Sequence, residues 1–275
     1  MYQRILLALD LEGVNLVVGD PYSGLVKGCE QWEIARRQAV LEINAAADAL
    51  FAAGAKRVDL WDNHGSNHNI DASLVDTRVR VINADRAMPR MSFAKGNYDC
   101  ICYFGYHAME GTLGGVLAHT WSSKSVQYCK LNGSYVGEID MDAYIAASHG
   151  MPSCFFAAGD ITCAQARREH PEIVTVTTKQ ELSRNEAIFR ENGELLSEIR
   201  EKIVEAVKRE HPIRNLSYPA VFEKSYKRVE DAAKFLARLR ERGMDADYPD
   251  DAILGKDAHT VVVTVHNIDE FTGCM

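Results

Sequence analysis

The chain has 275 residues, of which 47% are hydrophobic and 25% are charged, a composition typical of a globular protein with a sizeable core. Its formal net charge of −8 argues against a general nucleic-acid binder, because neutralising phosphates requires basic patches. Only five apolar residues precede Asp10, too few for a signal sequence or a membrane-spanning helix, so we expect a cytoplasmic protein.

Seven cysteines are scattered along the chain, mostly within apolar runs. This distribution is typical of buried thiols in a reducing compartment. Cys100 and Cys102 form a C-x-C pair whose side chains would share one face of a strand. A metal role for this pair is disfavoured, because no second cysteine pair completes a set of four thiolates.

Two acidic residues follow the first apolar run, which covers residues 5–9. Asp10 and Glu12 stand on either side of Leu11, and in an extended chain residues two apart point to the same face. Both carboxylates can therefore project from the C-terminal edge of a buried strand, where α/β sheets bind ligands. Two carboxylates so close repel each other unless a cation or a shared proton separates them, and a metal ion is the simplest answer. Alternatively, Asp10 begins a turn and Glu12 is solvated.

Strands and helices alternate along the rest of the chain, after a glycine-rich loop over residues 13–29. Strands are predicted over residues 56–61, 78–83, 98–106, 125–131, 134–138, 152–158, 173–178, 220–225 and 260–265. Helices are predicted over residues 30–53, 140–148, 160–170, 185–210 and 229–242, with Asp160 as the N-cap of the third. This alternation predicts an α/β fold with a mixed, largely parallel sheet flanked by helices.

Two prolines, Pro212 and Pro219, mark a boundary after the long helix predicted over residues 185–210. We expect a metal-binding catalytic α/β domain over residues 1–210. A smaller α/β portion over residues 211–275 would then pack on the first domain or cap it.

Metal-compatible side chains follow several of the predicted strands. His64 follows the strand over 56–61, His107 follows the strand over 98–106, and Glu138 closes the strand over 134–138. The candidate ligands are Asp10, Glu12, His64, His107 and Glu138. Three carboxylates and two imidazoles suit one or two divalent cations of the zinc type. In a two-metal site one carboxylate usually bridges the ions, and Asp10 is a candidate for that position.

Each candidate also has an alternative that involves no metal. His64 could cap the turn after the second strand, and His68, four residues later, could be the ligand instead. Glu138 could be the first residue of the following helix and interact with its dipole. His119 lies beyond a glycine-rich loop, over residues 111–115, that could approach a substrate.

Five short motifs in the same order resemble the zinc D-aminopeptidase family, the DppA-type metallopeptidases. The motifs are Asp10-Leu11-Glu12-Gly13, Asp62-Asn63-His64-Gly65, Gly105-Tyr106-His107-Ala108, Ala118-His119-Thr120, and Gly137-Glu138 followed by Ala143-Tyr144. The similarity covers residues 4–190, with only an architectural likeness afterwards. The loop that holds Glu110 is longer than in the family and lacks the basic residue after His-Ala, so the resemblance does not fix the substrate.

The resemblance implies a role for each matching residue. Two zinc ions would be held by Asp10, Glu12, His64, His107 and Glu138. His119 would be the catalytic residue, acting as a nucleophile or as an acid/base group near the metals. The family also implies a homo-oligomeric ring, with a decamer of stacked pentamers as one form of it.

These observations predict a zinc-dependent aminopeptidase that hydrolyses the N-terminal amide bond of short D-amino-acid peptides through a water activated by two zinc ions. A related zinc amidase acting on a lactam or a small amino-acid amide is the first alternative, suggested by the altered Glu110 loop. A non-catalytic, metal-stabilised oligomeric protein is the second. The second alternative would leave His119 without a task.

Overall fold

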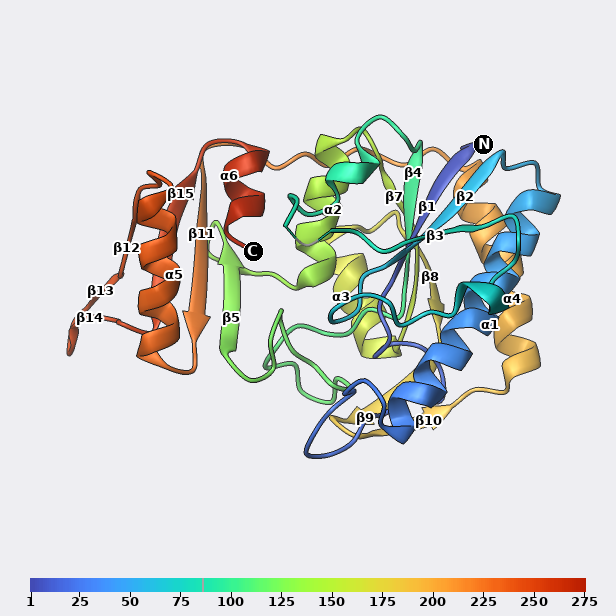
Figure 1. The fold of residues 1–275 in the computed structure, drawn as a ribbon, viewed down its shortest axis with the longest axis horizontal. Coiled ribbons are helices and arrows are strands. Elements are labelled where there is room, and N and C mark those ends of the chain that lie inside the picture. The colour runs from blue at the N-terminus through green and yellow to red at the C-terminus, as the bar shows by residue number, and fades with distance from the viewer. Residues whose placement is uncertain (86) are drawn as a thin grey trace.

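A six-stranded parallel sheet lies at the centre of the computed structural model, which describes residues 1–85 and 87–275 (Figure 1). Its strands, in spatial order, are β3 (Arg80–Ile82), β2 (Arg57–Asp62), β1 (Arg4–Leu9), β4 (Cys100–Phe104), β7 (Ser153–Ala158) and β8 (Val174–Thr177). The chain builds outward from β1 through β2 to β3 and then returns to add β4 on the other side. The switch point between β1 and β4 is where sheets of this kind bind ligands.

Helices cover both faces of this sheet, as Figure 1 shows. On one face, α1 (Glu30–Ala52) packs against α4 (Asn192–Lys208) over the side chains of Ile5, Leu7 and Leu9. On the other face, α2 (Glu138–Ser148) and α3 (Asp160–Glu169) pack over Leu6 and Ala8. Because β1 is apolar on both faces, its sequence is a continuous hydrophobic run, as expected for a buried parallel strand.

A second, antiparallel sheet lies beyond α2. Its strands, in spatial order, are β12 (Ala246–Asp247), β15 (Thr260–Val265), β11 (Ala220–Tyr226), β5 (Val126–Leu131) and β6 (Ser134–Tyr135). The helix α5 (Val229–Glu241) packs on this sheet, and α6 (Ile268–Gly273) contacts both β15 and α2. Since β5 pairs with β11, the C-terminal part of the chain is completed by a hairpin from residues 126–135. The domain boundary expected near residue 210 stays a prediction. The β5–β11 pairing joins residues from both sides of that boundary.

The remaining short elements lie at the edges of the two sheets. They are the hairpin of β9 (Lys179–Ser183) and β10 (Glu186–Phe189), the hairpin of β13 (Asp250–Asp251) and β14 (Gly255–Lys256), and the 3-10 helices Ala72–Leu74 and Ser92–Ala94. No helix within residues 1–85 and 87–275 is long and apolar enough to cross a membrane. The cytoplasmic location remains a prediction.

The predicted fold class is confirmed, with three local corrections. The helix predicted over residues 185–210 begins only at Asn192, because residues 186–189 pair with β9 and the Glu191 side chain caps the helix by accepting from the Glu194 N–H. Asp160 is the first helical residue and not the N-cap; Gly159 is the N-cap. The strand predicted over residues 134–138 ends at Tyr135, and Glu138 opens α2.

The loop after β1 is held from beneath by buried polar side chains. Lys179 is fully buried, and its Nζ donates to the carbonyl oxygens of Glu12, Val14 and Val17 at 2.6, 3.0 and 2.6 Å. On α1, the carboxylate of Glu42 accepts from the Asn15 N–H at 2.9 Å. These contacts fix the backbone that carries Glu12.

Glu42 gives the protein a pH dependence that can be measured. Burial raises the pKa of Glu42 to about 7, although hydrogen bonds from Gln38 and Asn15 oppose the rise. A carboxyl whose pKa is higher in the folded chain contributes stability fully below its unfolded pKa and loses that contribution as the pH rises through the folded value. The rise from 4.5 to about 7 corresponds to about 3 kcal/mol.

We therefore expect the free energy of unfolding to decrease between pH 5 and pH 8 more steeply in the natural protein than in Glu42→Gln. Glutamine keeps the shape and the accepting oxygen but does not titrate. Urea unfolding at several pH values measures the two slopes. Identical slopes would show that Glu42 is already ionised in the folded protein at pH 5.

Candidate metal centre

The candidate ligands meet at the C-terminal edge of the parallel sheet, next to the switch point between β1 and β4. Asp10 and Glu12 follow β1, His64 follows β2 and His107 follows β4. Glu138 arrives differently, as the first residue of α2. The prediction that a strand end delivers Glu138 is therefore wrong, and the alternative of a helix N-terminus is what the structure has.

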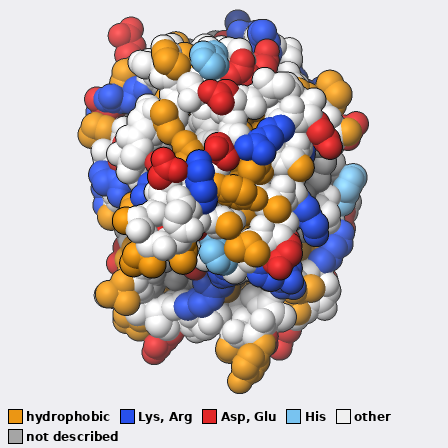
Figure 2. Space-filling model, turned by 90° about the vertical axis from the view of Figure 1, so that its left-hand side faces the viewer, with side chains coloured by type: hydrophobic (Ala, Val, Ile, Leu, Met, Phe, Trp, Pro, Cys, Tyr) orange, Lys and Arg blue, Asp and Glu red, His pale blue; other side chains and the backbone are white. Residues whose placement is uncertain are grey.

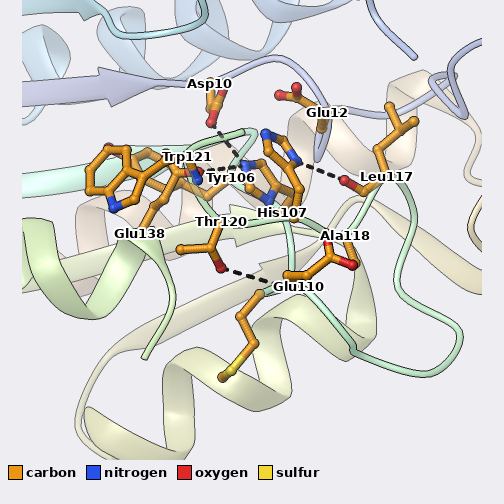
Figure 3. A network of polar contacts seen from close by, with 12 residues as sticks. Asp10, Glu12, Tyr106, His107, Glu110, Leu117, Ala118, Thr120, Trp121 and Glu138 are labelled. Atoms are coloured by element: carbon orange, nitrogen blue, oxygen red, sulfur yellow. Dashed lines mark hydrogen bonds and ion pairs between the residues drawn. The ribbon is translucent and has the colours of Figure 1, made fainter. Parts of the chain in front are cut away.

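The five side chains and His119 form one cluster. Asp10, Glu12, His107 and Glu138, labelled in Figure 3, are buried, and His64 and His119 are partly buried. The His107 Nε2 lies 3.6 Å from the Asp10 Oδ2 and 3.4 Å from the Glu138 Oε1. The His64 Nε2 lies 3.3 Å from the Glu12 Oε1. Each of two overlapping triplets, Asp10–Glu12–His107 and His107–His119–Glu138, has ligand atoms within 4.8 Å of one another. The spacing of these donors fits one or two divalent cations.

The hydrogen bonds of the three imidazoles determine which ring nitrogen faces the cluster. The Nδ1 atoms of His107 and His119 lie 3.1 and 2.8 Å from the carbonyl oxygens of Ala108 and Leu117. The His64 Nδ1 lies 3.5 Å from the Asn69 Oδ1. Oxygen acceptors assign the N–H to Nδ1, so each neutral ring keeps a lone pair on Nε2. Those lone pairs lie among carboxylate oxygens, an arrangement that a bound cation would satisfy.

The charges of the metal-free cluster indicate the same requirement. Burial and the neighbouring Glu12 raise the pKa of Asp10 well above its usual value. For His107, burial lowers the pKa but the hydrogen bond and charge of Glu138 outweigh it and raise the pKa to about 10. For His64, burial also lowers the pKa, but the charge and hydrogen bond of Glu12 outweigh it and raise the pKa to about 9. Positive charge is thus required among these buried carboxylates, and divalent zinc would supply it.

His119 differs from the other two histidines in its electrostatics. Its ring stacks on that of His107, with centroids 3.7 Å apart and planes at 13°. Burial and the neighbouring His107 lower the pKa of His119. A neutral imidazole with a free Nε2 can accept a proton near the metals, which suits an acid/base group.

Two other sequence candidates lie apart from the cluster. His68 is exposed, and its backbone N–H donates to the Asn83 Oδ1, so His64 is the histidine that faces Glu12. Cys100 and Cys102 are buried in β4 as free thiols, and burial raises their pKa values.

Several residues that support the cluster were not found from the sequence. Asp62, fully buried, accepts from the backbone and side-chain N–H groups of Asn69 and so positions the residue beside His64. The Trp121 N–H donates to the Glu138 Oε1 at 2.8 Å. Asp62 is the first residue of one recognised motif and Trp121 directly follows another, but no local signal distinguishes Asn69.

The cluster opens into a cavity of about 1250 Å³. The cavity is lined by four of the metal-binding candidates, by His119, and by Arg90 with Trp61 and Trp121; the four candidates are Asp10, Glu12, His64 and Glu138. Arg238 of α5 and Arg242, the C-cap of that helix, also line it, so the C-terminal part of the chain contributes to the lining. Residues 110–115 are not among the described residues that line the cavity.

Comparison with known proteins agrees with this geometry. The family model described as D-aminopeptidase, peptidase family M55, matches residues 3–239. The chain belongs to the D-aminopeptidase family. The resemblance read from the five motifs is thereby confirmed, and the match extends beyond residue 190.

Two relatives illustrate how far the similarity reaches. The D-aminopeptidase of Bacillus subtilis (strain 168) is 25% identical over 185 residues, covering 66% of this chain and 65% of the relative, just under two thirds of its length. A solved structure of the Zn-dependent D-aminopeptidase DppA from Bacillus subtilis, described as a self-compartmentalizing protease, superposes with a TM-score of 0.85. That comparison covers 99% of this chain and 95% of the other at 21% identity, so it supports the shared fold.

The different roles of His107 and His119 can be tested by substitution. His107→Ala removes a ligand, so we expect the loss of at least one zinc ion and a lower melting temperature, because metal bound to the folded state stabilises it. His119→Ala should keep its metal while activity falls by a factor on the order of 10²–10⁴. Elemental analysis of both purified variants provides the measurement, with exposed His68→Ala as the control. Zinc loss from His119→Ala with full retention in His107→Ala would reverse the assignment.

Proposed function

We propose that this protein is a zinc-dependent aminopeptidase that hydrolyses the N-terminal amide bond of short D-amino-acid peptides. The observation that carries the proposal is the cluster of three carboxylates and three imidazoles with their Nε2 lone pairs turned inward. Membership of the D-aminopeptidase family supports the same activity. The cavity is large enough for a peptide, since small-molecule sites commonly measure about 300–1,000 Å³.

Each residue of the cluster has a task in this reaction. Asp10, Glu12, His64, His107 and Glu138 would hold two zinc ions, with Asp10 the candidate for the shared ligand. Bound zinc polarises the scissile carbonyl and lowers the pKa of water toward ~7. His119, whose Nδ1 donates to Leu117, would accept a proton at Nε2 and pass it to the leaving amine. The lowered pKa of His119 keeps its ring neutral and ready to accept that proton.

The surface agrees with a small substrate and not a nucleic acid. Figure 2 views the side of the molecule that carries the second sheet, and there Lys and Arg side chains are interspersed with Asp and Glu. Such a mixed surface is unlike the continuous basic stripe that phosphate backbones require.

The amidase alternative loses its main support. It was suggested by the altered loop that holds Glu110, but the cavity lining contains no described residue from 110–115 and Leu113 at the loop tip is 96% exposed.

Metal removal tests the mechanism. Treatment with a chelator should reduce peptide hydrolysis to background, and zinc alone should restore it, because in the proposed reaction bound zinc activates the water and polarises the carbonyl. The substrate panel comprises short D-peptides, the matching L-peptides and small amides, including a lactam. Turnover of the D-peptides should be highest. Unchanged turnover after complete metal removal would rule out the mechanism, and turnover of the amides alone would favour the amidase.

Self-association is a separate part of the proposal. The structural relative is described as self-compartmentalizing, and here the apolar side chains of Tyr22, Leu113 and Ile253 are more than nine-tenths exposed. We expect a homo-oligomeric ring in solution, in which exposed apolar side chains such as these would be covered. Light scattering coupled to gel filtration measures the mass, and a monomeric mass would contradict this prediction.

A further inference from the structure

Arg90 occupies an unusual position in the wall of the cavity. Its guanidinium lies between two indole rings, 5.0 Å from the centroid of Trp61 and 4.7 Å from that of Trp121. The Nε and Nη2 atoms donate to the two oxygens of Asp142, which is fully buried. The Nη1 atom has no hydrogen-bond partner among residues 1–85 and 87–275, and the side chain is 18% exposed where it lines the cavity. The edge of the guanidinium formed by Nε and Nη2 is therefore paired with Asp142, and Nη1 can donate to a ligand in the cavity.

The position of this guanidinium is fixed relative to the metal centre. Asp142 lies one helical turn after Glu138 on α2, so the two carboxylates belong to the same rigid element. Asp142 also accepts from the Tyr106 Oη at 2.7 Å, and Tyr106 directly precedes His107. Trp121, which stacks on Arg90, donates its backbone N–H to Glu138. Three independent connections thus tie Arg90 to the candidate zinc ligands.

Two residues beside Arg90, one next to it in the chain and one next to it in space, have an unusual backbone conformation that supports a functional role. Met91, the next residue, has a φ of 61°, and Trp121 has a φ of 60°. Bulky residues rarely adopt this left-handed conformation, and it persists at functional sites where the surrounding structure enforces it. Here the enforced conformation places an indole against the guanidinium at the cavity wall.

The spacing of Glu138 and Asp142 along α2 can be compared with the length of a peptide substrate. Residues four apart in a helix are separated by about 6 Å along its axis. An extended peptide advances about 3.3–3.6 Å per residue. The backbone positions of Glu138 and of Asp142, the counter-ion of Arg90, are therefore separated along the helix axis by about the length of one or two extended peptide residues.

The charge of Arg90 matches one end of such a peptide. The metal-binding end of the cavity carries the carboxylates Asp10, Glu12 and Glu138, and Arg90 supplies a cation in the adjoining wall. A short peptide with free termini has an ammonium group at one end and a carboxylate at the other. An arginine with one free edge binds a carboxylate well, because its N–H groups match the carboxylate oxygens.

We infer that Arg90 is a specificity-determining residue that binds the C-terminal carboxylate of the substrate, so that the enzyme selects di- and tripeptides with a free C-terminus. This inference rests on the proposed aminopeptidase function and names its substrate class. The competing role is purely structural, with Arg90 serving only as the counter-ion of buried Asp142. The two roles differ in whether the substrate carboxylate matters.

Calorimetry on the zinc-loaded protein tests the inference without requiring turnover. The probes are two D-dipeptide analogues whose scissile amide is replaced by a CH₂–NH linkage, one ending in a free carboxylate and the other in a carboxamide. The natural protein should bind the acid about tenfold or more tightly than the amide, the scale of a charge-assisted, paired contact. Equal affinities would overturn the inference, and this measurement does not depend on any variant folding.

Two matched variants assign the effect to Arg90. Arg90→Lys keeps a cation beside Asp142 but loses the second edge of the fork, so the preference for the acid should fall to about twofold or less while the amide affinity changes little. Arg238→Lys is the control, because Arg238 lines the same cavity but is exposed. A preference lost in Arg238→Lys and kept in Arg90→Lys would overturn the assignment. Equal losses for acid and amide in Arg90→Lys would show the structural role instead.

Kinetics separate this inference from the proposed function. With D-dipeptides, Arg90→Lys should raise KM for the free acid by about tenfold, with a smaller change in kcat, and leave KM for the C-terminal amide unchanged. Hydrolysis of D-peptides without any acid preference would overturn the carboxylate site and leave the aminopeptidase intact. Selective binding of the acid analogue without hydrolysis of any peptide would support the site and contradict the proposed activity.

Discussion

The metal centre depends on how closely the end of β1 approaches the end of β4. The Asp10 N–H donates to the Phe104 oxygen at 2.8 Å, and the Gly13 N–H donates to the Gly105 oxygen at 2.7 Å. A Cβ at Gly105 would lie 2.0 Å from the Asp10 oxygen, and Gly105 also has a φ of 69°. Only glycine satisfies both conditions. Without this contact, the carboxylates after β1 would not reach the histidine after β4.

Burying so many charges at one sheet edge is costly, and the surrounding structure fixes the ligands before any metal binds. Three backbone carbonyls of the loop after β1 accept from the buried Lys179 ammonium, which holds Glu12 in place. Each ring Nδ1 is occupied by an oxygen acceptor, so the histidines cannot turn the wrong nitrogen toward the site. Ligands ordered in this way need little rearrangement on binding, which is the general advantage of a preorganised site.

Local sequence patterns were sufficient where local physics decides the structure. The apolar run of β1 and the amphipathic pattern of α1 predicted elements that the structure confirms. Glu138 was assigned to a strand because the Asn132-Gly133 hairpin signal is strong, whereas β6 pairs with β5 only as far as Tyr135. The chain then enters α2, with Gly137 as the N-cap and its N–H donating to the Asp140 carboxylate. The start of α4 was missed because residues 186–189 form the second strand of a hairpin with β9.

Local sequence patterns could not identify residues whose role depends on partners far away in the sequence. Arg90 lies in a segment without regular structure, and its counter-ion is 52 residues away in the sequence. Nothing in the neighbourhood of Arg90 indicates that two tryptophans, 29 and 31 residues away on either side, will enclose it. The motifs suggested the candidate ligands because each follows a recognisable strand or glycine, but the cavity wall has no motif of its own.

The helix α2 links the two parts of the site. Its first residue, Glu138, faces the candidate zinc cluster, and one turn later Asp142 holds Arg90. The same helix contacts α6 of the C-terminal portion, and that portion contributes Arg238 and Arg242 to the cavity. Because one rigid helix carries both the chemistry and the counter-ion of the cation, the distance between them cannot vary freely. If Arg90 binds the substrate carboxylate as proposed, this fixed spacing would select substrates by length without a mobile element.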